Sequence, residues 1–240
     1  NTTNITTLNA NVTTMGGDVT IGDTLYVTGA RTILTGSPIN GGMIQITGNV
    51  GSDDATGDTL TLDARGLFGD GDVDVQGDVG VGAINGVAAN DLNALTVFGN
   101  QVDLAIVEVT SGNIEVTGAN IDLNGVRYQT TTTGAITFTG PVDLTAAAVD
   151  VTGAGNAGDD VTFTSTIDGE AAGTNSLTIT AGGADVDIQG NTGGTTALDG
   201  FTIVSANQVD IQNVLANNIA VTGTNIDLNG TTYTANADDA

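Results

Sequence analysis

The sequence predicts an all-β protein that folds as a parallel β-solenoid, in which each strand pairs with the equivalent strand of the next coil. Three observations support this prediction: short runs of alternating apolar and polar residues, a recurrence of these runs roughly every 25 residues, and an unusual composition. The chain has 240 residues, with 36 glycines, 3% aromatic residues and no tryptophan. Such a composition suits a thin, uniform interior built from many short strands.

The alternation is clearest in residues 136–140, which read Ile-Thr-Phe-Thr-Gly, and it recurs in residues 161–165, which read Val-Thr-Phe-Thr-Ser. Looser copies stand at residues 44–48, 73–77 and 186–190. Apolar residues at every second position predict a strand with one buried face, and the small or polar residue that follows predicts a turn.

Eight such strands define the period. Their first apolar residues are separated by 25, 29, 29, 34, 25, 25 and 23 residues, and they are Val19, Ile44, Val73, Val102, Ile136, Val161, Val186 and Val209. A unit of this length cannot bury its apolar face alone, but it can when it is stacked on its neighbours. We therefore predict a solenoid of about eight coils, with Phe138 over Phe163 in adjacent coils.

A second, longer repeat contains several of these short units. Residues 120–125 and 225–230 are the same sequence, Asn-Ile-Asp-Leu-Asn-Gly, and residues 100–104 match 207–211 with one conservative change. We predict one continuous solenoid over residues 1–240, with a partial N-terminal coil in 1–18 and two four-coil blocks in 19–135 and 136–240. Tandem β-sandwich domains are the alternative. The short period and the missing core tryptophan disfavour them.

The chain is strongly acidic: it has 28 acidic residues, three arginines and no lysine, which gives a net charge of −25. The arginines are Arg31, Arg65 and Arg127. Such a surface repels phosphate groups, so we expect no nucleic-acid partner and no attraction to anionic lipid. No apolar run reaches the length of a membrane span, and we expect no membrane insertion.

Cysteine and histidine are both absent. Their absence excludes disulfides, zinc sites of the usual kind, and nucleophiles activated by histidine. Carboxylate pairs alone can perform acid–base catalysis, but a solvated acidic surface explains the same residues more simply. We expect a protein that is not an enzyme, with no catalytic and no cofactor-binding residues.

The middle residue of each organising strand is expected to point outward. These residues are Thr20, Gln45, Asp74, Asp103, Thr137, Thr162, Asp187 and Asp210. Asp74 beside Asp103 and Asp187 beside Asp210, with Asp72 and Asp185 nearby, offer oxygen ligands that suit Ca²⁺. Aspartates on a wet surface are the simpler interpretation, so no metal ligand is assigned and no cofactor is required. Outward threonines can form ice-binding ladders, but aspartate and glutamine interrupt this one.

The residues also resemble a known group. Residues 136–144 (Ile-Thr-Phe-Thr-Gly-Pro-Val-Asp-Leu) and 193–203 (Gly-Gly-Thr-Thr-Ala-Leu-Asp-Gly-Phe-Thr-Ile) are similar to the repeat regions of filamentous-haemagglutinin-like bacterial surface proteins. This resemblance implies a rod-like scaffold in an extracellular, cell-surface or secreted adhesive fibre. The chain begins with Asn1 rather than methionine, and we interpret it as a processed product or a section of a longer protein.

The expected function is a structural segment or subunit of an extracellular fibre or giant surface adhesin. It would assemble or continue end to end through open β edges, which pair readily with further strands. The expected partners are copies of itself or flanking solenoid repeats, with a cell-surface or glycan target. The alternative is a binding module with a calcium-bridged, glycan-binding or ice-binding face.

Overall fold

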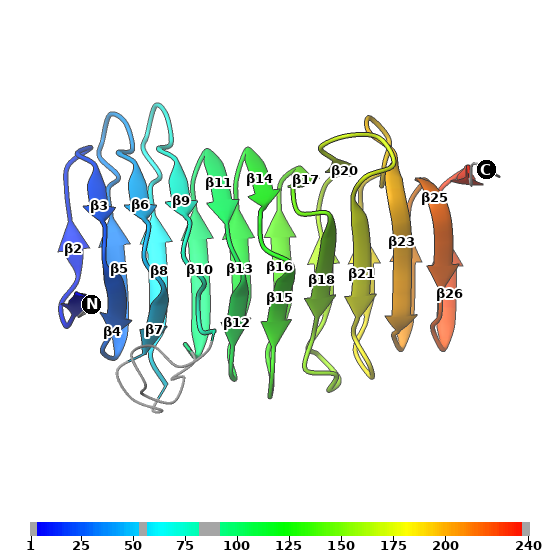
Figure 1. Cartoon of the computed structure of the whole chain (residues 1–240), viewed down its shortest axis with the longest axis horizontal. Helices are drawn as coiled ribbons and strands as arrows, with labels where there is room; N and C mark the ends of the chain where they lie inside the picture. Colours follow the sequence, from blue (N-terminus) through cyan, green and yellow to red (C-terminus); the bar gives the residue numbers. More distant parts are fainter. Residues whose placement is uncertain (1–3, 53–56, 82–91, 237–240) are drawn as a thin grey trace.

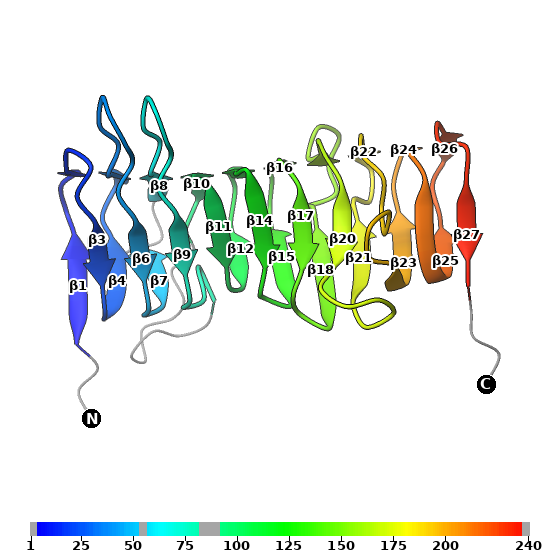
Figure 2. The ribbon, with the colours of Figure 1, turned by 90° about the horizontal axis from the view of Figure 1, so that it is seen from above.

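The protein is described by a computed structural model that covers residues 4–52, 57–81 and 92–236. These residues form 27 strands and contain no helix, so none of them forms an apolar helix that could cross a membrane. The paired strands run parallel, and the chain winds from the N-terminus at one end to the C-terminus at the other (Figures 1 and 2). The prediction of an all-β parallel solenoid is confirmed.

The coils have three faces, which we call the first, second and third in chain order. The second face is one unbroken sheet of ten strands: β2 (Val12–Thr13), β5 (Ala30–Leu34), β8 (Thr59–Asp63), β10 (Ala94–Phe98), β13 (Ile114–Thr117), β16 (Ile136–Thr139), β19 (Val161–Phe163), β22 (Val186–Ile188), β24 (Gln208–Ile211) and β26 (Asn225–Leu228).

The first face begins with β1 (Ile5–Leu8), β4 (Thr24–Val27) and β7 (Val50–Ser52), and a bridge at Val79 connects it onward. It continues with β12 (Val107–Val109), β15 (Arg127–Thr130), β18 (Ala148–Thr152), β21 (Ser176–Thr180), β23 (Leu198–Ser205) and β25 (Val214–Val221).

The third face holds β3 (Val19–Ile21), β6 (Ile44–Ile46), β9 (Val73–Val75), β11 (Gln101–Leu104), β14 (Asn120–Leu123), β17 (Val142–Leu144) and β20 (Ile167–Gly169). A bridge at Thr192 links β20 to the start of β25, which pairs in turn with β27 (Tyr233–Ala235).

The ten strands of the second face correspond to ten coils, more than the eight or so that the sequence predicts. The organising strands at Val19, Ile44, Val73 and Val102 lie on the third face, whereas those at Ile136, Val161, Val186 and Val209 lie on the second. The interval between Val102 and Ile136 is therefore long because it includes a change from the third face to the second. Coil length also varies: the paired residues Val97 and Val116 are 19 apart in sequence, whereas Leu62 and Val97 are 35 apart.

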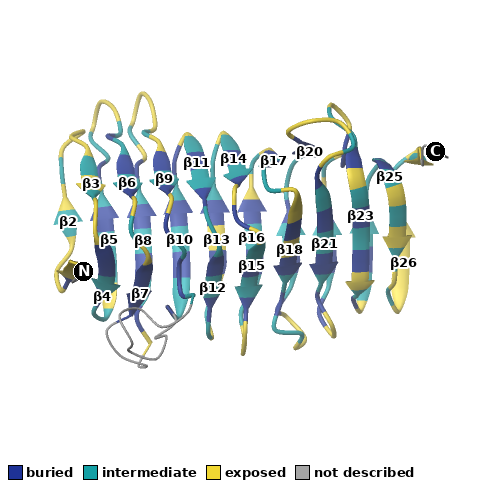
Figure 3. Ribbon diagram, viewed as in Figure 1, coloured by how far each residue is buried: buried dark blue, intermediate teal, exposed yellow. Residues whose placement is uncertain are grey.

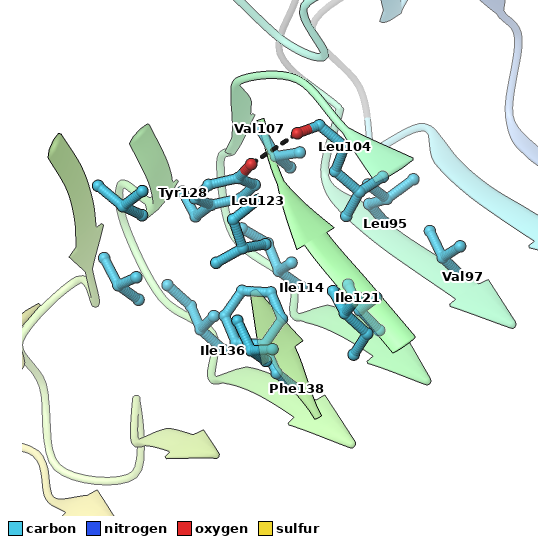
Figure 4. Packing of buried hydrophobic residues seen from close by; sticks show 14 of the residues in the cluster. Leu95, Val97, Leu104, Val107, Ile114, Ile121, Leu123, Tyr128, Ile136 and Phe138 are labelled. Carbon is cyan, nitrogen blue, oxygen red and sulfur yellow. Dashed lines mark hydrogen bonds between the residues drawn. The ribbon is translucent and has the colours of Figure 1, made fainter. Parts of the chain in front are cut away.

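The core consists of apolar columns that run along the stack, so that buried and part-exposed positions alternate along most of the inner strands (Figure 3). Phe138 lies over Phe163 with ring centroids 5.0 Å apart and planes at 24°, which confirms the predicted stack. Tyr128 meets Phe138 edge-on at 6.0 Å. Its hydroxyl donates to the Leu104 carbonyl at 2.6 Å, so the one buried phenol has a partner (Figure 4).

The two copies of the six-residue repeat have the same local structure on different faces. Tyr128 accepts from the amide of Gly125 at 3.0 Å, and Tyr233 accepts from Gly230 at 2.8 Å. Yet residues 120–125 follow the third face and 225–230 follow the second. The repeated unit is thus a strand, a corner and the next strand, rather than a block of whole coils.

The expected blocks 19–135 and 136–240 are joined without a break, because β13 pairs with β16 across their boundary. Residues 1–3 and 237–240, at the outer ends of the expected segments, lie outside the described residues.

Candidate functional site: two ladders of stacked aspartates

The outward residues of the third face form a row of five aspartates, which we call the long ladder. Successive residues of the long ladder are paired in register in adjacent coils, and they are Asp74, Asp103, Asp122, Asp143 and Asp168. Equivalent positions in parallel strands are about 4.8 Å apart. The predicted neighbours Asp74 and Asp103 are confirmed, and the row continues for three more coils.

The second face carries a short ladder of Asp187, Asp210 and Asp227, again paired in register. The predicted pair of Asp187 and Asp210 is confirmed. The same row continues toward the N-terminus with Thr162, Thr137, Glu115, Thr96, Thr61 and Thr32.

The expected outward row is correct within each half, but its two halves, Thr20 to Asp103 and Thr137 to Asp210, lie on different faces. Gln45 and Asp74 belong to the third face and Thr137 and Thr162 to the second. Only Glu115 breaks the threonine row.

Asp122, Asp143, Asp168 and Asp227 were not predicted as members of a ladder. Three of them stand in triplets with an apolar residue on each side, at 121–123, 142–144 and 226–228, and these triplets are the sequence signal that marks them. Asp168 lacks this signal, because Gly169 follows it. Its Oδ1 accepts from the amides of Thr195 and Thr196 at 2.8 and 3.0 Å, so the ladder ends against the next corner.

Asp72 and Asp185, expected near the two pairs, serve as links between coils. Asp72 Oδ1 accepts from Asn100 Nδ2 and from the Gln101 amide, both at 3.1 Å. Asp185 Oδ1 makes the same two bonds to Asn207 and Gln208, at 2.9 and 3.0 Å. Each acceptor oxygen is occupied by one side-chain amide and one backbone amide from the next coil, so the two residues hold the coils together.

Amide side chains donate hydrogen bonds to some of the stacked carboxylates. Asp74 Oδ2 accepts from Gln45 Nε2 at 3.0 Å and from Gln76 Nε2 at 2.7 Å. Asp122 Oδ1 accepts from Asn120 Nδ2 at 2.9 Å. Each N–H donor offsets part of the repulsion between like charges in adjacent strands.

The middle of the long ladder is electrostatically strained. Partial burial, together with the charges of Asp103 and Asp143 on either side, raises the pKa of Asp122 to about 6. A hydrogen bond with the Asp103 carboxyl adds to this rise. At mildly acidic pH, Asp122 therefore holds a proton that it can share with its neighbour.

A polar groove with a volume of about 490 Å³ lies along the same face. It is lined by Gln101, Asn120, Asp122, Asp143, Thr145 and Glu170, among others. The ladder spaces its carboxylates along a line. Within the described residues, no three acidic side chains converge as metal ligands. No metal ligand is therefore assigned among these residues, and calcium binding stays a hypothesis that a comparison of Ca²⁺ with Mg²⁺ tests.

The arginines lie away from this groove. Arg31 belongs to β5 and donates to the Ala30 carbonyl at 2.8 Å. Arg65 pairs with Asp63 at 2.7 Å and lies over the Phe98 ring. Arg127, in β15, pairs with Glu108. The groove therefore presents carboxylates, amides and hydroxyls, and none of the three arginines lines it.

Comparison with family models, with curated proteins and with solved structures found no match to this chain.

Proposed function

We propose that this chain is a structural segment or subunit of an extracellular fibre or giant surface adhesin, which extends end to end through its open strand edges. The observation that carries the proposal is the exposure of core positions in the last coil. Ile226 and Leu228 are 39% and 56% exposed, whereas Val209 and Ile211, their partners in the preceding coil, are at most 1% exposed. One further coil would bury both side chains.

The first coil shows the same property at the other end. Ile5 in β1 is 44% exposed, and Val12 and Val19 are only partly buried. Within the described residues, each end offers one free strand edge per face, because β1, β2 and β3 stand at one end and β25, β26 and β27 stand at the other (Figures 1 and 2). Parallel pairing fixes the polarity, so the C-terminal end of one unit meets the N-terminal end of the next.

The partners in this proposal are flanking solenoid repeats or further copies of the chain. Burying a large aliphatic side chain contributes about 1.5–3 kcal/mol, so several uncovered core positions at each end favour continuation. The acidic exterior keeps neighbouring rods apart laterally, because like charges repel. The resemblance of residues 136–144 to surface-fibre repeats supports an extracellular location with a cell-surface or glycan target.

The test uses the chain and a tandem fusion of two copies. In the fusion, we expect the amides of β26 and β27 in the first copy to become as protected from hydrogen exchange as those of β24. The free chain should form longer rods in negative-stain images as its concentration rises. The double variant Ile226→Asp, Leu228→Asp should prevent both effects, because it places charge in the new core.

The matched control carries Val126→Asp and Val204→Asp, which alter exposed apolar residues outside the terminal strands. It should behave as the unaltered chain does. Dispersed single rods at every concentration, together with a fusion whose junction amides exchange freely, would rule the proposal out.

A further inference from the structure

The most exposed large apolar side chains gather at one corner of the first three coils. Met15, Phe68, Leu67 and Ile39 are 84%, 79%, 73% and 66% exposed, more than any other large apolar residue among those described. They lie in the loops between the second and third faces, at residues 14–18, 35–43 and 64–72. The longer two loops project beyond the body of the rod and are exposed at their tips (Figures 1–3). We call the four side chains the apolar crest.

The loops of the crest are stacked and ordered like the coils beneath them. The amides of Leu67 and Phe68 donate to the carbonyls of Ser37 and Ile39 at 3.3 and 2.9 Å, and Gly41 donates to Gly69 at 2.7 Å. In the first coil, Gly16 donates to the Thr35 carbonyl at 3.0 Å. Backbone pairing therefore fixes the crest before any partner arrives, which lowers the ordering cost of binding.

A second copy of the chain is a poor occupant for the crest. At about 25 cal/mol per Å², the gain of about 1.5–3 kcal/mol for burying such a side chain corresponds to about 60–120 Å², so the four together supply less than about 500 Å². A stable complex between proteins needs about 800 Å² from each partner. The crest is also convex, so two copies would meet only along its tips. A fluid apolar phase requires no matching cavity, and burial there scales with the apolar area that enters it.

The acidic residues around the crest determine which lipid headgroup charge is favoured. Asp18 and Asp70 stand in the same loops and accept from the amides of Met43 and Gly66. The nearest arginine, Arg65, is neutralised by its ion pair with Asp63. These acids repel anionic headgroups but attract the ammonium group that forms the outer layer of a phosphatidylcholine surface.

We propose that the apolar crest inserts into the outer leaflet of a zwitterionic lipid bilayer and attaches the rod to that surface. The contact is interfacial and does not span the membrane. The sequence predicts no membrane insertion because it lacks a long apolar run. The crest is assembled from single residues of three loops, which only the stacking of the coils brings together. This attachment is independent of the open ends, and it stands whether or not units join end to end.

The experiment exploits the absence of tryptophan from the chain. In the variant Phe68→Trp, the new indole reports on its own surroundings. We expect its emission to shift to the blue when phosphatidylcholine vesicles are added. The matched control Val126→Trp places the indole at another exposed apolar position and should show no shift.

A second variant adds Met15→Ser, Ile39→Ser and Leu67→Ser to Phe68→Trp. Its partition coefficient into vesicles should fall on the order of a thousandfold, since each of the three large apolar side chains removed contributes about tenfold. Far-UV circular dichroism should stay unchanged, because these side chains are outside the core. Phosphatidylglycerol at one fifth of the lipid should weaken binding at low salt.

Three outcomes would overturn the proposal. The Phe68→Trp emission could remain unshifted by phosphatidylcholine, the Val126→Trp control could shift equally, or binding could require the anionic lipid. A blue shift that appears on concentrating the protein without lipid would identify a second copy as the occupant instead.

Discussion

Single side chains at the corners tie each coil to the next. Asn113 Oδ1 accepts from the Ala135 amide at 3.0 Å, and Asp160 Oδ1 accepts from the Asp185 amide at 2.9 Å. Short side chains with a carbonyl or carboxylate oxygen suit this position, because they satisfy amides that turn away from the sheets. Much of the excess of aspartate and asparagine is therefore structural.

Glycine has a complementary role where corners approach closely. Gly140 has φ of +128°, and a Cβ there would lie 1.9 Å from the Gly118 carbonyl oxygen. A Cβ on Gly77 would likewise lie only 2.1 Å from the Gly48 carbonyl oxygen. A side chain at such a corner would push adjacent coils apart and break their pairing.

The clearest corner acid is Asp159, which is buried and accepts from the Gly134 amide at 2.7 Å, the Asn156 amide at 3.0 Å and Asn156 Nδ2 at 2.8 Å. Asp159→Ala should lower the free energy of unfolding by about 1–3 kcal/mol, because it leaves three part-buried N–H donors without their charged acceptor. Urea unfolding at pH 7 measures the change. The control Asp150→Ala removes an exposed acid from a strand in the same part of the rod and should change stability little. Equal effects of the two substitutions would contradict this role.

At the scale of elements, strand pairing creates the long ladder and its strain. Partial burial and the two neighbouring carboxylates together raise the pKa of Asp122 to about 6. The folded chain thus binds this proton more tightly than the unfolded chain, whose aspartates titrate near 3.9. By linkage, the contribution of Asp122 to stability falls as pH rises from about 4 to about 6, and the penalty persists above that range.

Asp122→Asn should therefore raise the thermal unfolding midpoint at pH 7.5 and have little effect at pH 4. The amide oxygen can still accept from Asn120 Nδ2, so the local bond is retained. Thermal melts of both proteins between pH 4 and pH 8 test this difference. Asp227→Asn, at the exposed end of the short ladder, is the control. A gain that is the same at all pH values would exclude charge relief as its cause.

At the scale of the whole molecule, a net charge of −25 is spread along a rod whose faces bear rows of carboxylates. Self-repulsion destabilises the folded rod, and salt reduces it. The long ladder gathers charge in a line and brings no three acids together as ligands in the described ranges.

We therefore expect Ca²⁺ and Mg²⁺ at equal concentration to raise the unfolding midpoint equally, by screening. Calorimetry after chelation and addition of each ion measures the two shifts. A larger shift with Ca²⁺ that disappears in the double variant Asp103→Asn, Asp122→Asn would instead establish a calcium site on the third face.

The sequence by itself determined the fold class, the stack of Phe138 on Phe163 and the neighbouring pairs of Asp74 with Asp103 and Asp187 with Asp210. Each follows from a short local pattern, because alternation along a strand sets which side chains are buried and similar strands stack in register. The identical motif at 120–125 and 225–230 likewise predicts an identical corner.

Only the tertiary structure decided the face on which each strand lies, the number of coils, the length of the long ladder, the strain at Asp122 and the gathering of the apolar crest. The physical reason is that corners differ widely in length, so distance along the chain does not reveal position around the coil. Contacts between coils set that position, and they place Asp122 between Asp103 and Asp143 and bring Met15, Ile39 and Phe68 to the same corner.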